Sequence, residues 1–481
     1  MSTIWNAVTF PFRMIPWWGY LLILSILAWL GRNVLLIIAT IIFFHPVPIP
    51  PLFQGEPETV LQARMQDLDH FGHVRRNERS FTPEQRQAFG GAIDALGERA
   101  GELTDAGFQL ELARLQAMID NGHSNASATR MVQSLPRLPI RSVWMSGELR
   151  ILRALPGYEA LLGAEITGIN GVAADNAIWL FRDAFGGVDD WYLTFAPLLL
   201  ETPAYLDAVG LGEGPVRIDY IGRDGQHGVV ELHPVDPSAD TSRISSGDLL
   251  MPWMNESHDW VSFEPAGSPV YLGNPDNDYW YTAIPEDNAI FINLRANLDD
   301  ASGETLVDWI DRATSEIREL SPRFIIVDQR FNSGGDLTRT EPMMVALSDI
   351  VGPNGRVYLL ASGNTFSAGI VNLAMAEEAA PGRTFLVGEP IGDRLQFWAE
   401  GWWYSLPNSG FRARYSTGYY DLQNGCEGIL ICHWGSLRVF PVIVDDLDID
   451  IPAPMTFDAY AAGRDPGMEA VLADISRNGG N

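Results

Sequence analysis

Residues 324–336 read FIIVDQRFNSGGD, an apolar run followed by a polar loop with two adjacent glycines. The apolar part, Phe324 to Val327, predicts a buried strand. Earlier in the chain, Ala289 to Leu294 predicts another buried strand, and Ser302 is expected to cap the helix between the two. This strand, helix, strand order predicts a parallel sheet. The apolar face of the helix is formed by Leu306, Ile310, Ala313, Ile317 and Leu320.

The glycine loop precedes a candidate nucleophile. Paired glycines allow backbone N–H groups to face a ligand, so the loop can hold an oxyanion, with Gly335 as the expected donor. A further strand, Arg356 to Ala361, leads to Asn364-Thr365-Phe366-Ser367-Ala368-Gly369 and a helix through Ala380. Ser367 therefore lies at a strand-to-helix turn. The N–H of Ala368 and the helix dipole would both face charge that develops beside this serine.

The composition restricts the chemistry. The chain of 481 residues contains no lysine, so all 32 basic residues are arginine. A serine hydroxyl needs a neighbouring base, and histidine is the common base that remains. The 61 acidic residues and the net charge of −29 oppose binding to nucleic acid. Two cysteines and scattered histidines predict no metal cluster, and we expect no cofactor.

The amino-terminal region predicts a membrane anchor. Residues 17–44 contain only Arg32 and Asn33 as strongly polar residues. As one helix they would be about 40 Å long, more than the roughly 30 Å hydrocarbon core. We expect one uncleaved single-pass helix, with a re-entrant hairpin as the alternative because Arg32 is costly in lipid. It would lie between a tail, 1–16, and a proline-rich linker, 45–56.

The rest of the chain is expected outside the cytoplasm, in the periplasm or at the cell exterior. Cys426 and Cys432 either form a local disulfide, which would suit such an oxidising compartment, or are two unrelated thiols.

Residues 57–135 predict a helical domain. Thr82, Pro83 and Gln85 have the spacing of a helix start with a capping box. A second helix should end at Asn121-Gly122, directly before His123. Such a histidine is more often a surface or capping residue than a catalytic one. The apolar face of the second helix comprises Phe108, Leu112, Leu115 and Ile119.

Residues 136–240 predict short strands. Residues 162–171 predict a strand with an Asn-Gly turn, followed by a helix over 177–185. Residues 216–221 and 229–232 predict a hairpin. This order resembles a PDZ domain, whose groove binds an extended peptide by strand addition. A plain β-rich spacer is the alternative.

Four short motifs, in this order, carry a family resemblance: Asp328 to Gly335, Thr365-x-Ser367-Ala368, Val387-Gly388-Glu389 and Ala462-Gly463-Arg464-Asp465-Pro466. Together they resemble the C-terminal processing proteases and the tricorn core protease. The resemblance implies an α/β fold, with residues 241–481 as a crotonase-like ββα serine peptidase core and a peptide or protein as substrate.

The family has two branches that differ in the catalytic base. In one, a lysine follows the nucleophile; Asp393 occupies the matching position here, so that branch is excluded. In the other, the base is a histidine in an Asp-x-His-Thr-like motif. Asp120-Asn121-Gly122-His123-Ser124 matches that motif with one extra residue. The resemblance therefore implies that His123 is the general base for Ser367.

The resemblance also implies a glutamate that orients the imidazole, sometimes through a serine. Glu400 is the first candidate and Glu427 the second. Ser124 is a weaker candidate for the serine, because the family places it before the histidine, where this chain has Gly122.

Three other functions remain open. One is a catalytically inactive protein that binds peptides or lipids, using a surface that includes Trp402 and Trp403. Another is an esterase with the same serine. An acyl-CoA enzyme on the same scaffold is disfavoured by the acidic, lysine-free composition. The sequence does not define the substrate or the oligomeric state.

Overall fold

A computed structural model describes residues 55–212, 214–236, 246–253, 260–425 and 442–478, with short pieces at 25, 29–32 and 34–35. Within these residues, no helix has both the length and the apolar character needed to cross a membrane. Apart from the short pieces, the predicted anchor over 17–44 lies outside the described residues, as do Cys426 and Cys432.

The carboxy-terminal half is built on a six-stranded sheet in the order β17-β12-β11-β10-β9-β8. The strands from β9 to β17 pair in parallel, as predicted, and β8 closes one edge antiparallel. The strands are β8 Tyr279–Ile284, β9 Ala289–Leu294, β10 Phe324–Asp328, β11 Arg356–Ala361, β12 Thr384–Gly388 and β17 Ile451–Pro452.

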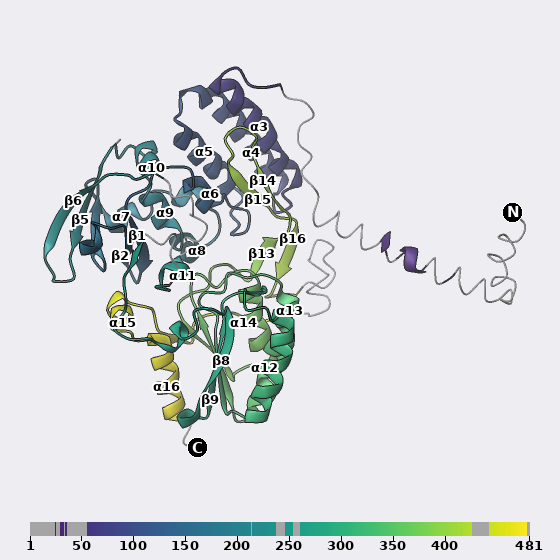
Figure 1. The fold of residues 1–481 in the computed structure, drawn as a ribbon. Coiled ribbons are helices and arrows are strands. Elements are labelled where there is room, and N and C mark those ends of the chain that lie inside the picture. The colour runs from purple at the N-terminus through teal and green to yellow at the C-terminus, as the bar shows by residue number, and fades with distance from the viewer. Residues whose placement is uncertain are drawn as a thin grey trace, which may run out of the picture.

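Helices cover both faces of this sheet (Figure 1). Alternate strand residues point to opposite faces, so Ile325 and Val327 pack in one core and Phe324 and Ile326 in the other. The first core lies under α12 Leu306–Leu320, α13 Leu337–Val351 and α14 Ala368–Ala379, and the second under α16 Pro466–Asn478.

The predicted cap of α12 was wrong. Thr305, not Ser302, caps this helix by accepting the N–H of Asp308. The helix thus begins three residues later than expected. Asp299 accepts the N–H of Leu306 at 2.9 Å and caps the same helix start a second time.

Four helices form the predicted amino-terminal helical layer. The capping box of Thr82 and Gln85 is confirmed at the start of α4. α5 ends before the predicted Asn121-Gly122, and Asp120, with φ of 51°, turns the chain towards His123. The helices are α3 Val60–Asn77, α4 Pro83–Arg99, α5 Asp105–Ala117 and α6 Ala128–Val132.

A second sheet follows, in the order β1-β2-β3-β5-β6. The predicted Asn170-Gly171 turn is confirmed: both residues have positive φ, 47° and 82°, and they join β3 to β4. The strands are β1 Ile140–Met145, β2 Glu148–Ala154, β3 Glu165–Ile169, β4 Val172–Ala173, β5 Val216–Ile221, β6 His227–Leu232 and β7 Val261–Ser262, which pairs with β2.

The helix predicted over 177–185 was wrong. α7 spans only Ala174–Ala177, and η3 Arg182–Ala184 follows after a turn. The Tyr192 hydroxyl donates to the carbonyl of Ile178 at 2.6 Å, which takes an acceptor that a continuing helix would use. Three short helices, α8 Asp189–Leu193, α9 Ala196–Leu200 and α10 Pro203–Ala208, fill the insertion before β5.

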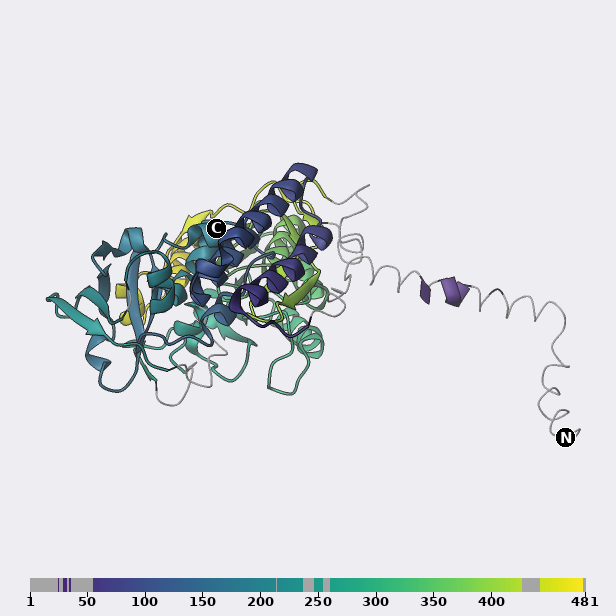
Figure 2. The same cartoon turned by 90° about the horizontal axis from the view of Figure 1, so that it is seen from above.

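A hairpin from the carboxy-terminal half packs into the helical layer (Figures 1 and 2). β14 Trp402–Ser405 pairs with β15 Arg412–Tyr415. The rings of Tyr404 in β14 and of Phe411, just before β15, both lie 6.1 Å from the ring of Phe71 in α3. β15 also contacts the loop after His123, where Ala126 bridges Ala413. A second hairpin, β13 Gln396–Ala399 with β16 Gly418–Asp421, joins this extension to the core.

Candidate active site

The candidate nucleophile occupies a strained turn. Ser367 precedes α14 with φ of 54° and ψ of −123°, a conformation that costs a non-glycine residue on the order of 1–3 kcal/mol. Gly334 lies directly against it: a Cβ on Gly334 would be 2.6 Å from Ser367 Cβ and 3.1 Å from its Oγ. Only glycine allows the oxyanion loop to approach the serine this closely.

Both expected oxyanion donors line a cavity of about 260 Å³ together with Ser367. Ala368 is the first residue of α14, so its N–H has no acceptor within the helix. Next to Gly335, Asn297 donates to the carbonyl of Gly334 and accepts from Asp336. Because Asn297 pairs with the residues on either side of Gly335, the N–H of Gly335 points away from Asn297. Among the described residues, neither the Gly335 nor the Ala368 N–H has a backbone acceptor.

A buried polar network supports this loop and the serine turn. Asn332 accepts the N–H of Gly334 at 2.9 Å through its side chain, and its carbonyl accepts the N–H of Phe366 at 3.0 Å. Its amide group donates to Asn297 at 2.8 Å, and Asn372 of α14 donates to the same oxygen at 3.0 Å. The network therefore fixes the distance between the donors and the nucleophile. Sequence reasoning missed it, although Asn372 in an otherwise apolar helix face was a signal.

His123 is buried, with an exposed fraction of 5%, and lines the same cavity as Ser367. Its ring lies between two aromatic rings, with centroid distances of 4.3 Å to Phe366 and 5.2 Å to Phe397. Its Nε2 is buried and makes no hydrogen bond within the described part of the chain. A free ring nitrogen in the cavity of the serine is what a general base requires.

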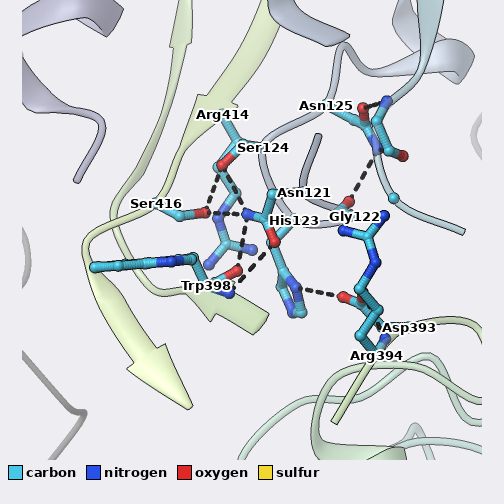
Figure 3. A network of polar contacts seen from close by, with 12 residues as sticks. Asn121, Gly122, His123, Ser124, Asn125, Asp393, Arg394, Trp398, Arg414 and Ser416 are labelled. Atoms are coloured by element: carbon cyan, nitrogen blue, oxygen red, sulfur yellow. Dashed lines mark hydrogen bonds and ion pairs between the residues drawn. The ribbon is translucent and has the colours of Figure 1, made fainter. Parts of the chain in front are cut away.

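The other ring nitrogen faces an acid that sequence reasoning did not assign. Nδ1 of His123 lies 3.4 Å from Oδ2 of buried Asp393, an ion-pair distance longer than a normal hydrogen bond (Figure 3). In the resemblance described above, Asp393 matches the position of the lysine in the other branch. This correspondence was the available signal.

Gly122 has no room for a side chain. A Cβ at this position would lie 2.9 Å from Oδ2 of Asp393 and 2.9 Å from the Phe366 ring. The Asp393 carboxylate occupies the space that a serine side chain would need.

The three other candidate residues have different positions. Glu400, with φ of 59°, lines the cavity, and its Oε1 accepts the Tyr420 hydroxyl at 2.7 Å. The acid at ion-pair distance from His123 is instead Asp393. Ser124 bonds Glu78 at 2.8 Å and Ser416 at 2.7 Å, on the other side of the loop from the imidazole (Figure 3). Glu427 lies outside the described residues.

Two asparagines hold the histidine loop. The side chain of Asn121 donates to the carbonyl of Trp398 at 2.9 Å and accepts its N–H at 3.3 Å. Asn125 donates to the carbonyl of Gly122 at 3.1 Å and accepts the N–H of Gly186 at 2.7 Å. The loop is therefore fixed to β13 on one side and to the 186–187 turn on the other.

The electrostatics favour a neutral imidazole. Burial is the largest effect and lowers the pKa of His123 below 6.5; Asp393 and Glu400 act in the opposite direction, and Arg414 lowers the pKa further. At neutral pH the ring is therefore unprotonated and able to accept a proton.

A cleft of about 790 Å³ adjoins His123. Trp191 stacks on Phe366 in its wall, with a centroid distance of 4.0 Å, and Phe195, Phe331 and Trp403 add aromatic surface. The cleft is large enough for several residues of an extended peptide.

Two of the resembling motifs meet in a structural cluster. Arg330 binds Asp328 at 2.6 Å and Asp465 at 2.8 Å, and all three side chains are buried. This cluster joins the end of β10 to the start of α16 and does not line the cavity of Ser367.

Comparisons with known proteins agree with this fold. No family model and no curated protein matches the sequence. Among solved structures, mature CPAF has a TM-score of 0.55 at 12% identity, over 88% of this chain and 99% of that one. Mature CPAF complexed with lactacystin has a TM-score of 0.55 at 11% identity, over 87% and 98%. The photosystem II D1 C-terminal processing protease aligns over 84% and 98%, at 12% identity, with a TM-score of only 0.36. The CPAF likeness establishes the fold.

Proposed function

We propose that this chain, which has the fold of mature CPAF, is a serine peptidase with Ser367 as nucleophile and His123 as general base. One observation carries the proposal. Ser367 and His123 come from distant segments, yet both line one cavity of about 260 Å³, where Nε2 of the histidine has no partner among the described residues.

The proposed reaction follows acyl-enzyme chemistry. Nε2 of His123 removes the proton from Oγ of Ser367, which attacks the carbonyl carbon of the scissile peptide bond. The N–H groups of Gly335 and Ala368 stabilise the oxyanion. The imidazolium then protonates the leaving amine, and water, activated by His123, hydrolyses the ester on Ser367.

Asp393 is the proposed orienting acid. Its carboxylate would hold the Nδ1–H tautomer, so that Nε2 carries the lone pair directed at the serine, and would stabilise the imidazolium. Glu400 remains a second acid in the cavity, where it acts on His123 over a longer distance.

Activity-based labelling tests the proposal. A fluorophosphonate probe should label Ser367 in the wild-type protein and fail to label Ser367→Ala or His123→Ala. Turnover of an unstructured protein substrate should fall by about 10⁶-fold in either variant. Ser302→Ala and His227→Ala, both exposed and remote from the cavity, are the matched controls.

Two outcomes would oppose peptidase activity. A wild-type protein that is folded but reacts with no probe and cleaves no peptide would indicate a binding protein on the same fold. Hydrolysis of alkyl esters without hydrolysis of peptides would indicate an esterase.

We further infer from the apolar run at 17–44 that the chain is anchored in a membrane, with its catalytic part in the periplasm or outside the cell. Fractionation of cells that express the full chain or residues 55–481 tests this inference. The full chain should sediment with membranes and resist carbonate extraction, whereas the shorter chain should not. Equal behaviour of the two would refute the anchor.

A further inference from the structure

The imidazole of His123 lies within an aromatic column of five rings, in the order Trp191, Phe366, His123, Phe397 and Tyr420. Trp191 stacks on Phe366 with a centroid distance of 4.0 Å and an interplanar angle of 6°. At the other end, Tyr420 stacks on Phe397 at 4.9 Å, also at 6°. The imidazole itself is 9° from parallel with Phe397 and 31° from parallel with Phe366. Aromatic rings therefore cover both of its faces.

The two rings that contact His123 are placed by the supports of the active site. Phe366 directly precedes the nucleophile, and its N–H donates to the carbonyl of Asn332 at 3.0 Å. Phe397 lies on β13 next to Trp398, whose carbonyl accepts from Asn121 of the histidine loop at 2.9 Å. One ring is thus fixed to the oxyanion-loop network and the other to the loop that carries the base.

The outer rings hold the inner ones. Tyr420 lies opposite Phe397 in the β13–β16 pair, and its hydroxyl donates to Oε1 of Glu400 at 2.7 Å. Trp191 also meets Phe195 edge-on at 5.3 Å. The imidazole can therefore turn away from the serine only if the aromatic column opens.

The aromatic column also bears on the charge of the imidazole. Burial is the largest effect on the pKa of His123 and lowers it, while Asp393 and Glu400 raise it and Arg414 lowers it. The face of an aromatic ring carries negative potential and attracts a cation within about 6 Å, most strongly where water is excluded. The centroids of Phe366 and Phe397 lie 4.3 and 5.2 Å from that of the imidazole. Their faces would therefore offset part of the cost of a buried imidazolium.

We propose that Phe366 and Phe397 are positioning residues that hold the imidazole at Ser367 and stabilise its protonated form through their ring faces. This inference rests on the proposed peptidase function, in which His123 carries a proton from the serine to the leaving amine. A purely structural role predicts the opposite sign. If the rings only excluded water, their loss would raise the pKa of His123; if their faces stabilise the cation, their loss lowers it.

Fluorination of the ring at position 397 tests the proposal without changing the packing. Phenylalanine rings that carry one, two or three fluorine atoms keep nearly the same shape and have a progressively weaker negative face. The turnover of a peptide and the rate of fluorophosphonate labelling should fall stepwise along this series. Phe397→Leu, which removes the ring, should lower both by about 2-fold to 30-fold, and Phe366→Leu should act in the same direction.

Titration of His123 in the full chain is a second readout that needs no turnover. Histidine that is isotope-labelled at Cε1 gives separate NMR signals, and the signal of His123 is the one missing from His123→Gln. Its midpoint should fall stepwise along the fluorine series, and by about 0.4 to 1.5 pH units in Phe397→Leu.

Phe385 provides the matched control. It stacks on Tyr358 at 5.7 Å and lines neither the cavity of Ser367 nor the larger cleft. The same replacements at Phe385 should leave the rates and the titration of His123 unchanged. Thermal unfolding establishes that each variant is folded.

Rates and midpoints that stay constant along the fluorine series, or a midpoint that rises in Phe397→Leu, would overturn the inference and leave the proposed peptidase standing. A wild-type protein that cleaves no peptide and reacts with no probe would refute the proposed function. In that protein, a His123 midpoint that falls along the series would still support stabilisation of the imidazolium by the aromatic column.

Discussion

Replacement of Asp393 by asparagine isolates the contribution of the acid beside His123. The substitution preserves size and removes one negative charge at 3.4 Å from Nδ1. With an effective dielectric constant of about 20, Coulomb's law gives about 5 kcal/mol between an imidazolium and a carboxylate at this distance. Since about 1.4 kcal/mol corresponds to a tenfold change in rate, kcat/KM should fall by about 10³-fold to 10⁴-fold.

Steady-state hydrolysis of a fluorogenic peptide and the rate of fluorophosphonate labelling both measure this effect. Asp120→Asn is the matched control: Asp120 lies on the same loop, is exposed and pairs with Arg394 at 3.0 Å, away from the imidazole. A loss of less than tenfold in Asp393→Asn, together with a large loss in Glu400→Gln, would show that Glu400 orients the histidine. The assignment of Asp393 would then be refuted.

The remaining predictions concern proton balance and the buried charges. Burial lowers the pKa of His123 below 6.5, so the imidazole stays neutral as the pH falls through 6.5. The acid limb of the kcat/KM profile should therefore have its midpoint below pH 6.5. A midpoint at or above about pH 7 would contradict the burial argument. Arg330→Met leaves Asp328 and Asp465 buried without their cation and should lower the free energy of unfolding of the carboxy-terminal half by about 3–5 kcal/mol in urea titrations. The exposed ion pairs of Arg312 provide the control, because Arg312→Met should change the free energy of unfolding by less than about 1 kcal/mol. Equal losses in the two variants would show that the Arg330, Asp328 and Asp465 cluster does not stabilise this half.

The sequence predicted the parts of the fold that depend on local pattern. β9 and β11 begin and end at the predicted residues, because continuous apolar runs between polar turns define buried strands. In the expected helix over 177–185, the carbonyl of Ile178 accepts the hydroxyl of Tyr192 from a later segment, a contact that periodicity does not reveal.

The candidate site shows the same division. Ser367, Gly335 and Ala368 follow from a strand, a glycine loop and a helix start, and His123 from a motif. Asp393 could not be derived in this way, because its position beside His123 depends on the absence of a side chain at Gly122, 271 positions earlier. Asn121 and Asn125 act through backbone groups of Trp398 and Gly186, and such contacts leave no local sequence signal.

The β14–β15 hairpin has a consequence for biosynthesis. Asp67 of α3 accepts the backbone N–H groups of Asn408 and Ser409 at the hairpin tip, at 2.9 and 2.8 Å, across more than 300 residues of chain. Until the ribosome has released that tip, the histidine loop lacks one of its supports. A nascent chain would therefore bring Ser367 and His123 into their final arrangement only after synthesis has passed residue 409, late in translation.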